Sequence, residues 1–320
     1  MPEPFDLSRP PKAVTDDVAR LGAALDEKVP RKRLDHNLLI ATWNIRAFGD
    51  LTEAWQAPPD ASPKRDYHAL ACIAEIVSRF DVIGIQEVRG NLKALRHLLK
   101  LLGPDWSFVL TDVTRGKPGN DERMAFLFDT RRARMSGLAC ELVLPADYAE
   151  GVEQFARTPY AVSFLSAGRD FKATFILVTL HVLYGKRKQD RTPELAAIAK
   201  WVEDMALDVN AYDQNLLVLG DFNTDRRDDP NYQALMSTDL WVPPELHEVP
   251  RTISSNDPTA NHYDQIAWFN GEGKAPALSL TYAGQAGCVN FVDVVFADLD
   301  TNDLSWKMSD HLPLWVEFLV

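Results

Sequence analysis

The segment most suggestive of chemistry is LLVLGDFNTD, residues 216–225. Its apolar start is long enough for one buried strand, and Gly220 allows the backbone to turn sharply afterwards. Asp221 and Asn223 follow two residues apart, so continued extended backbone would place both side chains on one face. A carboxylate and a carboxamide at a sheet edge could bind a ligand, although an Asx turn explains this segment alone equally well.

Polar residues stand at the ends of several other apolar runs. Each one taken alone is better explained as a structural hydrogen-bonding group. Together they offer carboxylate and amide oxygens, which favour Mg²⁺, Mn²⁺ or Ca²⁺, and histidines that could bind or protonate phosphate oxygens. This inventory suits phosphoester hydrolysis, and no GxSxG or HExxH motif supports a serine hydrolase or a zinc enzyme. The residues are Asn44, Glu87, Glu122, His181, Asp264, Asp310 and His311.

The elements that must position these groups are a mixture of strands and helices. Helical spacing predicts helices at residues 15–29, with Thr15 as the cap, and at 67–80, 92–102 and 193–209. Many hairpin-like pairs and few strict βαβ units predict an α/β fold of mixed sheets packed face to face, with helices outside. Strands are predicted at 38–45, 81–88, 106–111, 122–129, 138–144, 158–164, 171–180, 216–219, 263–269, 291–296 and 312–319.

Composition and charge narrow the class of protein. The 320 residues are 46% hydrophobic with a formal net charge of −12, which argues against a general nucleic-acid-coating protein. Cys72, Cys140 and Cys288 are far apart and suggest neither a disulfide framework nor a metal site. We expect a cytoplasmic protein with no membrane span, because no apolar run resembles a signal or a span and the cysteines fit a reducing compartment. No obligate protein partner is evident from the sequence.

Eight ordered motifs resemble the endonuclease/exonuclease/phosphatase superfamily, and within it the deoxyribonuclease I group. The resemblance runs from residue 38 to residue 320 and implies a four-layered α/β sandwich. It implies a single catalytic domain over residues 37–320, preceded by an extension, residues 1–36, that contains a helix. The motifs are WNIRAFGD (43–50), QEVRG (86–90), ERMAFLF (122–128), FARTPYAVSF (155–164), TLHV (179–182), GDFNTD (220–225), YDQIAW (263–268) and SDHLPL (309–314).

The resemblance also implies a metal centre and a group that acts on water. Glu87, with Asn44 and Asp310 nearby, would bind the divalent cation, which is expected to be Mg²⁺ with Mn²⁺ or Ca²⁺ as alternatives. Asp221 would orient or activate the attacking water. Asn223 would hold the phosphate.

Two histidine–carboxylate pairs and a set of arginines complete the implied site. His181 would pair with Glu122, and His311 with Asp264. Contacts to substrate are implied for three arginines, Arg46, Arg89 and Arg157.

Two residues depart from the deoxyribonuclease I pattern. Asn120 stands where that group has a tyrosine that packs into the DNA minor groove, and Asp121 stands where it has a lysine. Both changes remove chemistry that favours DNA. Catalytic chemistry is therefore better supported than duplex DNA as the substrate. The resemblance favours a metal-dependent endonuclease that hydrolyses DNA, with a phosphatase or phosphodiesterase acting on a small-molecule or lipid phosphate as the alternative. A non-catalytic binding module is a third class, which the intact set of polar residues opposes.

Overall fold

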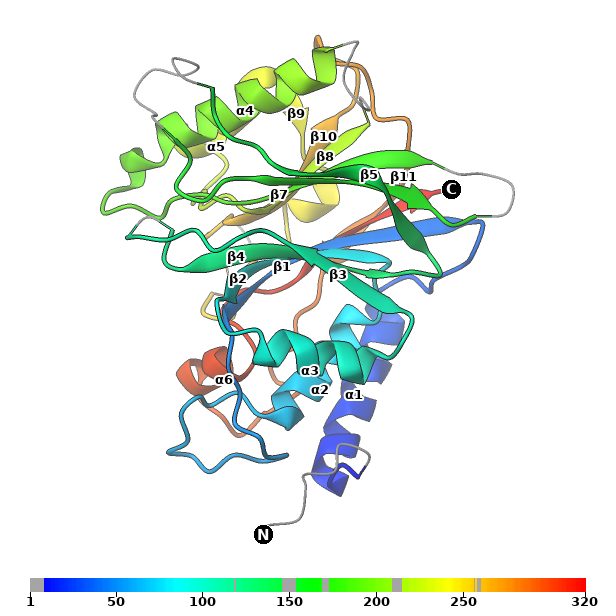
Figure 1. Ribbon diagram of the computed structural model, residues 1–320, viewed down its shortest axis with the longest axis vertical. Coiled ribbons are helices and arrows are strands. Elements are labelled where there is room, and N and C mark those ends of the chain that lie inside the picture. The colour runs from blue at the N-terminus through cyan, green and yellow to red at the C-terminus, as the bar shows by residue number, and fades with distance from the viewer. Residues whose placement is uncertain are drawn as a thin grey trace.

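The strands form two mixed six-stranded sheets (Figure 1). The computed structural model describes residues 9–117, 119–145, 154–168, 173–208, 215–255, 257 and 260–320. The first sheet has the order β11 (Thr281–Cys288), β12 (Leu314–Leu319), β1 (Asn37–Phe48), β2 (Val82–Arg89), β4 (Glu122–Asp129) and β3 (Trp106–Leu110). The second has the order β5 (Ala133–Glu141), β6 (Tyr160–Ser166), β7 (Thr174–His181), β8 (Leu216–Asp221), β10 (Asp264–Phe269) and β9 (Leu240–Trp241).

Each sheet has one parallel pair at its centre, β1 with β2 and β7 with β8, and antiparallel strands on both sides. Parallel neighbours need a crossover connection, and here each connection contains a helix. The carboxyl ends of each parallel pair therefore lie at the same edge of their sheet.

Helices cover the outer face of each sheet, which gives four layers (Figure 1). Helices α1 (Lys12–Lys28), α2 (Tyr67–Val77) and α3 (Lys93–Leu102) lie on the first sheet. Helices α4 (Thr192–Leu207) and α5 (Pro230–Leu235) lie on the second, and the short α6 (Thr301–Lys307) lies beside β1. Single turns of 3₁₀ helix occur at Lys188–Asp190, Met236–Thr238 and Pro244–Leu246. The predicted four-layered sandwich is confirmed.

Strand β1 shows why the central strands read as continuous apolar runs. Leu38 and Ile40 belong to the core shared with the second sheet, whereas Leu39, Ala41 and Trp43 belong to the core beneath the helices. All five side chains are buried, because both faces of a central strand are covered in this architecture.

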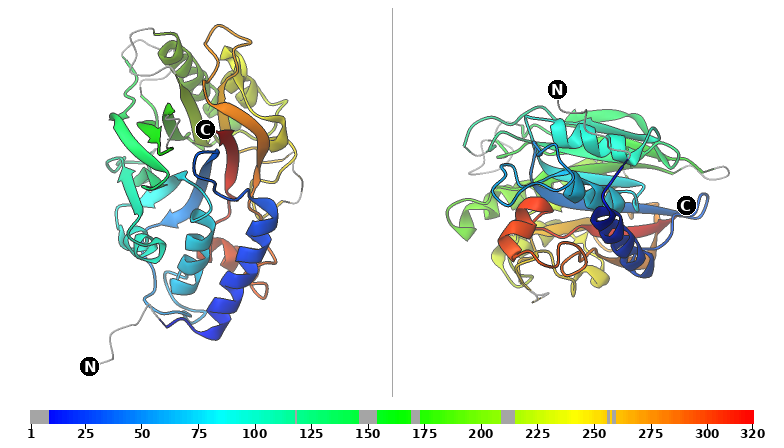
Figure 2. Two further views of the ribbon diagram at one scale, coloured as in Figure 1. Left: turned by 90° about the vertical axis from the view of Figure 1, so that its right-hand side faces the viewer. Right: turned by 90° about the horizontal axis from the view of Figure 1, so that it is seen from below.

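Helix α1 packs against α2 at one end of the molecule (Figure 2). Its buried residues Leu21 and Leu25 join the core beneath the first sheet. Arg79 donates to the Gly22 carbonyl at 3.2 Å, and the His68 Nε2 atom lies 3.1 Å from an Asp17 oxygen. The helix in the predicted extension is thus part of the helical layer; residues 1–8 of that extension lie outside the described residues.

Some predicted boundaries are wrong. The strand expected at 291–296 is a series of turns, in which Asp293 and Phe296 have φ values of 62° and 51°. The strand expected at 138–144 lies earlier, as β5. Helix α1 begins before Thr15, whose hydroxyl donates to the Lys12 carbonyl within the helix and does not cap it.

Strand β11 and the short α5, α6 and β9 were not predicted, because none has a long periodic apolar pattern. Residues 171–172 of the strand expected at 171–180, and residue 209 of the helix expected at 193–209, lie outside the described residues. In the described part of the chain, the helices are too short or too polar to cross a membrane.

Buried polar side chains of β1, β2 and β7 connect the two sheets through hydrogen bonds. The Gln86 Nε2 atom of β2 donates to Thr179 Oγ1 of β7 at 2.9 Å and lies 3.1 Å from Thr42 Oγ1 of β1. All three residues are fully buried. A satisfied buried network of this kind fixes the position of one sheet against the other.

Candidate active site

Asp221 ends strand β8 in a tight turn. Gly220 before it has a φ of 138°, and a Cβ atom there would lie 2.1 Å from the Leu180 carbonyl oxygen, so glycine is required. The Asn223 backbone N–H donates to Asp221 Oδ1 at 2.9 Å, and Asn223 has a φ of 51°. The segment is therefore an Asx turn, which is the alternative that the sequence left open beside a continued extended backbone.

Two histidines flank the Asp221 carboxylate. Strand register places His181 of β7 beside Asp221, and Asp264 of β10 on its other side. The His181 Nε2 atom lies 3.5 Å from Asp221 Oδ2, and the His311 Nε2 atom lies 4.0 Å from the same oxygen. His311 precedes β12, and the Trp43 indole N–H donates to its carbonyl at 2.9 Å. Both sheets thus contribute to one cluster.

Each histidine has a carboxylate at its other ring nitrogen. The His311 Nδ1 atom lies 2.6 Å from Asp264 Oδ2, a hydrogen-bond distance. The His181 Nδ1 atom lies 3.3 Å from Glu122 Oε2, an ion-pair distance. The structure therefore brings together the two pairs named from the sequence, and a carboxylate in this position orients the ring and fixes its proton.

Burial and charge act in opposite directions on the ionisation of this cluster. Burial lowers the pKa of His311, but Asp264 and Asp221 outweigh it, so that pKa lies well above its usual value. Burial raises the pKa of Asp221, but His181 and His311 outweigh it and lower the pKa. At neutral pH the His311 ring is therefore charged and faces an ionised Asp221.

Glu122 also holds the arginines that were expected to contact substrate. Arg157 Nε lies 2.7 Å from Glu122 Oε2, and Arg89 Nη2 lies 3.2 Å from Oε1. Asn120, a departure from the family pattern, donates its amide to Oε1 at 2.5 Å and accepts from Arg89 at its carbonyl. His181 and the two guanidinium groups outweigh the effect of burial and lower the pKa of Glu122.

The three residues expected to bind metal lie at the ends of β1 and β2 and before β12. Asn44 Nδ2 donates to Asp221 Oδ2 at 3.0 Å, and its buried Oδ1 has no hydrogen-bond partner among the described residues. Glu87 has a φ of 61° at an irregularity in β2, and its Oε2 accepts from the Ala47 N–H at 2.8 Å. Asp310 adjoins His311. Where the chain is described, no three His, Cys, Asp or Glu side chains are grouped to hold a metal.

Arg65, which the sequence did not single out, is buried and interacts electrostatically with Glu87 and Asp310. Burial lowers its pKa to about 10, and the charges of these two carboxylates oppose the shift. Its guanidinium donates to the Arg46 and Met308 carbonyls at 2.8 and 3.0 Å. It thereby ties the end of β1 to the segment that leads to Asp310.

Arg46 and Asn223 use their side chains away from the histidines. Arg46 donates to Ser305 and lies 3.8 Å from the ring centre of Trp306, both on α6. Asn223 Nδ2 donates to the Val182 carbonyl at 2.7 Å. Contacts of Arg46 with substrate and of Asn223 with phosphate therefore stay predictions.

Arg191 is a second buried residue that sequence reasoning missed. It donates to the Asn223 carbonyl at 2.6 Å and to Asp225 Oδ2 at 3.0 Å, and it stacks on Tyr184 at 4.3 Å. These contacts hold the turn after Asp221. A lone arginine before a helix gives no sequence signal for such a role, because it belongs to no periodic pattern.

The two mixed sheets and the histidine–carboxylate cluster at their common edge define a class of phosphoester hydrolases. Over residues 41–311 the chain matches the Endonuclease/Exonuclease/phosphatase family, and it belongs to that family.

Curated relatives of the chain are named deoxyribonucleases, and solved structures that share its fold include a sugar phosphatase. The chain is 29% identical over 291 residues to a deoxyribonuclease of Thioalkalivibrio sp. (strain K90mix), a match that covers 88% of this chain and 71% of the relative. It is 30% identical over 201 residues to deoxyribonuclease-1 of Bos taurus, which covers 60% of this chain and 63% of the relative. A mannosyl-6-phosphatase of Bacteroides thetaiotaomicron shares the fold, with a TM-score of 0.57, 17% identity, and coverage of 88% and 100%.

Proposed function

We propose that this protein is a divalent-metal-dependent phosphodiesterase that cleaves DNA internally. The observation that carries the proposal is the position of the Asp221 carboxylate between two histidines, each with its own carboxylate. The deoxyribonuclease names of two relatives support DNA as the substrate.

The cluster can divide the work of hydrolysis among its side chains. Asp221, ionised at neutral pH, accepts a proton from the attacking water and orients it. Charged His311 presents its Nε2–H to a phosphate oxygen, where negative charge increases in the transition state. Asp264 and Glu122 keep the two rings oriented, so little reorganisation is needed during the reaction.

The residues near β1 and β2 fit a hard divalent cation. The buried Asn44 Oδ1 lacks a hydrogen-bond partner among the described residues. The charges of Glu87 and Asp310 both raise the pKa of the buried Arg65 guanidinium. Mg²⁺ commonly takes one or two carboxylates and completes its coordination with waters and substrate oxygens. Glu87, Asn44 and Asp310 would hold the cation, which when bound supplies Lewis-acid stabilisation of the phosphate charge.

Nicking of supercoiled plasmid tests this function. We expect nicking with Mg²⁺ that stops with EDTA and returns when Mg²⁺ or Mn²⁺ is added. Glu87→Gln should lose this activity and bind Mg²⁺ more weakly by calorimetry, with an unchanged unfolding temperature. Unchanged Mg²⁺ binding in this variant would contradict the assignment of Glu87, and absence of nicking with every cation would contradict the nuclease.

A phosphatase of small substrates is the second candidate. It is favoured by Asn120 and Asp121, which replace DNA-contacting residue types, and by the fold shared with a sugar phosphatase. Phosphate release from sugar phosphates and inositol phosphates, measured beside plasmid nicking, separates the two candidates.

A further inference from the structure

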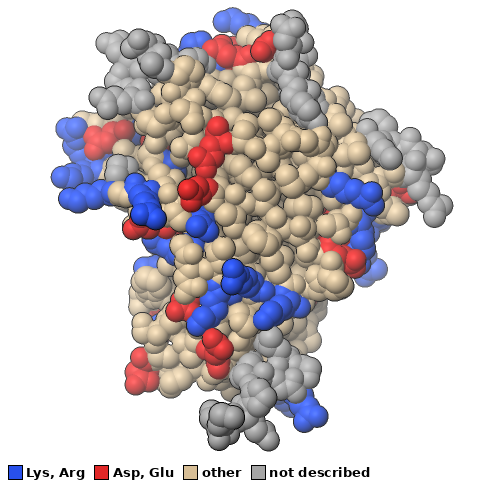
Figure 3. All heavy atoms as spheres, in the orientation of Figure 1, with Lys and Arg blue, Asp and Glu red and all other residues tan. Residues whose placement is uncertain are grey.

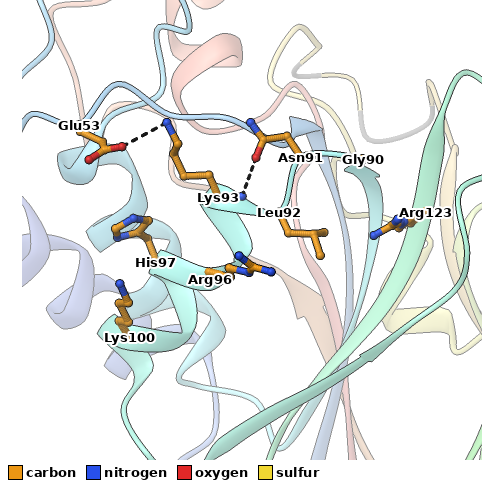
Figure 4. Close-up of a pocket in the computed structure, with 9 residues that line it drawn as sticks. All are labelled: Glu53, Gly90, Asn91, Leu92, Lys93, Arg96, His97, Lys100 and Arg123. Atoms are coloured by element: carbon orange, nitrogen blue, oxygen red, sulfur yellow. Dashed lines mark hydrogen bonds and ion pairs between the residues drawn. The ribbon is translucent and has the colours of Figure 1, made fainter.

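A cavity of about 610 Å³ opens beside α3, on the helix side of the first sheet (Figure 4). One wall is the exposed face of α3, and the opposite wall is Arg123 of β4. The turn that follows β2, residues 90–92, closes one end. The cavity is separate from the cluster around Asp221, whose residues do not line it.

The cavity wall is strongly basic although the whole chain is acidic. It contains one carboxylate, Glu53, in a chain with a net charge of −12. Lysine and arginine side chains gather on the surface over α3 (Figure 3). The positively charged side chains that line the cavity are Lys93, Arg96, Lys100 and Arg123. His97 also lines it, and burial lowers the pKa of its ring.

Most of this positive charge is not neutralised by the protein. Lys93 lies 3.0 Å from Asp50 and 3.2 Å from Glu53. Arg96 and Lys100 are exposed, and among the described residues neither has a carboxylate at ion-pair distance. A concave surface with unpaired cations attracts an anion.

Two buried nitrogen atoms of the cavity wall also lack a partner. Arg123 Nε and His97 Nδ1 are inaccessible to solvent and accept or donate no hydrogen bond within the described part of the chain. Because solvent does not reach these two atoms, an anion in the cavity would meet the exposed Arg96 and Lys100 first.

Neighbouring residues at the ends of β2 and β4 belong one to the cavity and the other to the active site. Arg123 adjoins Glu122 on β4, and alternation along the strand turns Glu122 toward the second sheet and Arg123 toward the helices. Gly90 adjoins Arg89 on β2, and Arg89 reaches Glu122 at 3.2 Å. Arg89 therefore lies between the histidine cluster and the cavity.

We propose that this cavity binds backbone phosphates of a nucleic-acid strand that continues from the active site, past Arg89, onto α3. The inference rests on the proposed function and extends it, since it makes the substrate a polynucleotide. A strand carries a phosphate at every nucleotide, so it can occupy both places at once, whereas a small ester occupies only the catalytic cluster.

The test is duplex DNA binding by Arg96→Gln/Lys100→Gln, measured by fluorescence anisotropy in EDTA over a series of salt concentrations. Glutamine is a good helix former at these exposed positions of α3, so the fold should persist. The control Lys12→Gln/Lys200→Gln removes the same charge at exposed positions of α1 and α4. We expect affinity to fall on the order of tenfold, and the salt slope to decrease by about 2, only in the α3 variant.

A second readout separates this inference from the proposed function. Turnover of a small phosphodiester, bis(p-nitrophenyl) phosphate, should be the same in wild type and α3 variant, because neither residue belongs to the catalytic cluster. Equal duplex affinity in the α3 variant and its control would overturn the inference and leave a plasmid-nicking enzyme intact. If duplex binding depends on α3 but no nicking occurs with any cation, the proposed nuclease function is wrong and the phosphate-binding role of the cavity still holds. If the wild type binds no duplex, the phosphate-binding role of the cavity is wrong.

Discussion

The Glu122 carboxylate divides its two oxygens among four partners. Oε1 meets the Asn120 amide and Arg89, and Oε2 meets Arg157 and the His181 ring. One buried side chain thus sets the positions of a histidine and two arginines. Burying the carboxylate charge costs free energy, which its positively charged partners offset. They can do so only while Glu122 is ionised.

Glu122→Gln should weaken the protein in a pH-dependent way. The pKa of Glu122 is lowered in the folded state, so its contribution is present above its usual pKa of 4.5 and disappears as the pH falls through the lowered value. We expect a loss of about 2 kcal/mol at pH 7, typical of hydrogen bonds to a charged group. Urea unfolding from pH 7 to pH 3 measures it; a difference that stays constant down to pH 3 would contradict this ionisation.

His311 and Asp264 should behave as one catalytic unit. The ring and carboxylate are 2.6 Å apart and buried, so loss of either removes the oriented, charged imidazole. His311→Ala and Asp264→Asn should each reduce kcat on the order of 10²–10⁴-fold. The double variant should be little worse than either single one. Multiplicative losses in the double variant would show that the two residues act independently.

Among individual residues, the polar side chains at strand ends could be predicted from the sequence because they stand in short ordered motifs. The residues that hold these side chains in place could not be predicted. Arg65 and Arg191 contact backbone carbonyls of segments far away in the chain, and such contacts leave no spacing in the sequence to read. Asn120 was noticed only as a departure, whereas the structure shows it as a partner of Glu122.

At the scale of elements, the start of α4 braces two segments of the site. Glu194 in the first turn of α4 is buried, and its two oxygens lie 3.1 Å from the Ala156 N–H and 3.3 Å from the Leu183 N–H. Burial raises the pKa of Glu194. Ala156 precedes Arg157, and Leu183 lies two residues after His181, the last residue of β7. Glu194 of α4 therefore helps to position Arg157 and His181 through the backbone next to them.

Glu194→Ala should therefore reduce kcat without direct contact with substrate. We expect a loss of about 1–3 kcal/mol in stability, because two buried N–H groups lose their acceptor. Glu194→Gln should restore most of both properties, since its amide oxygen can accept from one N–H. Glu203→Gln, a partly exposed position on the same helix, is the control. The predicted loss of stability with an unchanged kcat would limit Glu194 to a structural role.

The same scale shows where apolar runs mislead. Residues 291–296, FVDVVF, have the composition of a strand but fold as turns, with Phe291 and Val295 buried beneath the first sheet. Strand β11 contains two glycines and few apolar residues, so it pairs with β12 without a sequence signal. Tertiary packing decides both cases.

At the scale of the whole molecule, the helix before β1 is a structural support distant from the chemistry. It leads to Asn37, the end of β1 opposite Asn44. Leu21 is 1% exposed and belongs to the core beneath the first sheet, on a helix that packs against α2. Leu21→Ala should lower the free energy of unfolding by about 2–5 kcal/mol, through lost contacts and a cavity.

The kcat/KM of this variant should equal that of wild type well below its unfolding temperature. Glu27→Ala, an exposed position on α1, should change neither property. A change in kcat/KM for Leu21→Ala alone would show that α1 contributes to the site as well as to stability.

The position of β12 between β11 and β1 has a consequence for the order of events during synthesis. The buried contact of Asn37 with Glu317 joins residues 280 apart in the chain. A ribosome therefore releases β1 long before the neighbour that covers its edge exists, and Asp310 and His311 emerge just ahead of that neighbour. Until then the edge of β1 lacks its neighbour and can pair with other chains, and the catalytic cluster cannot be complete before residues 310 and 311 have emerged.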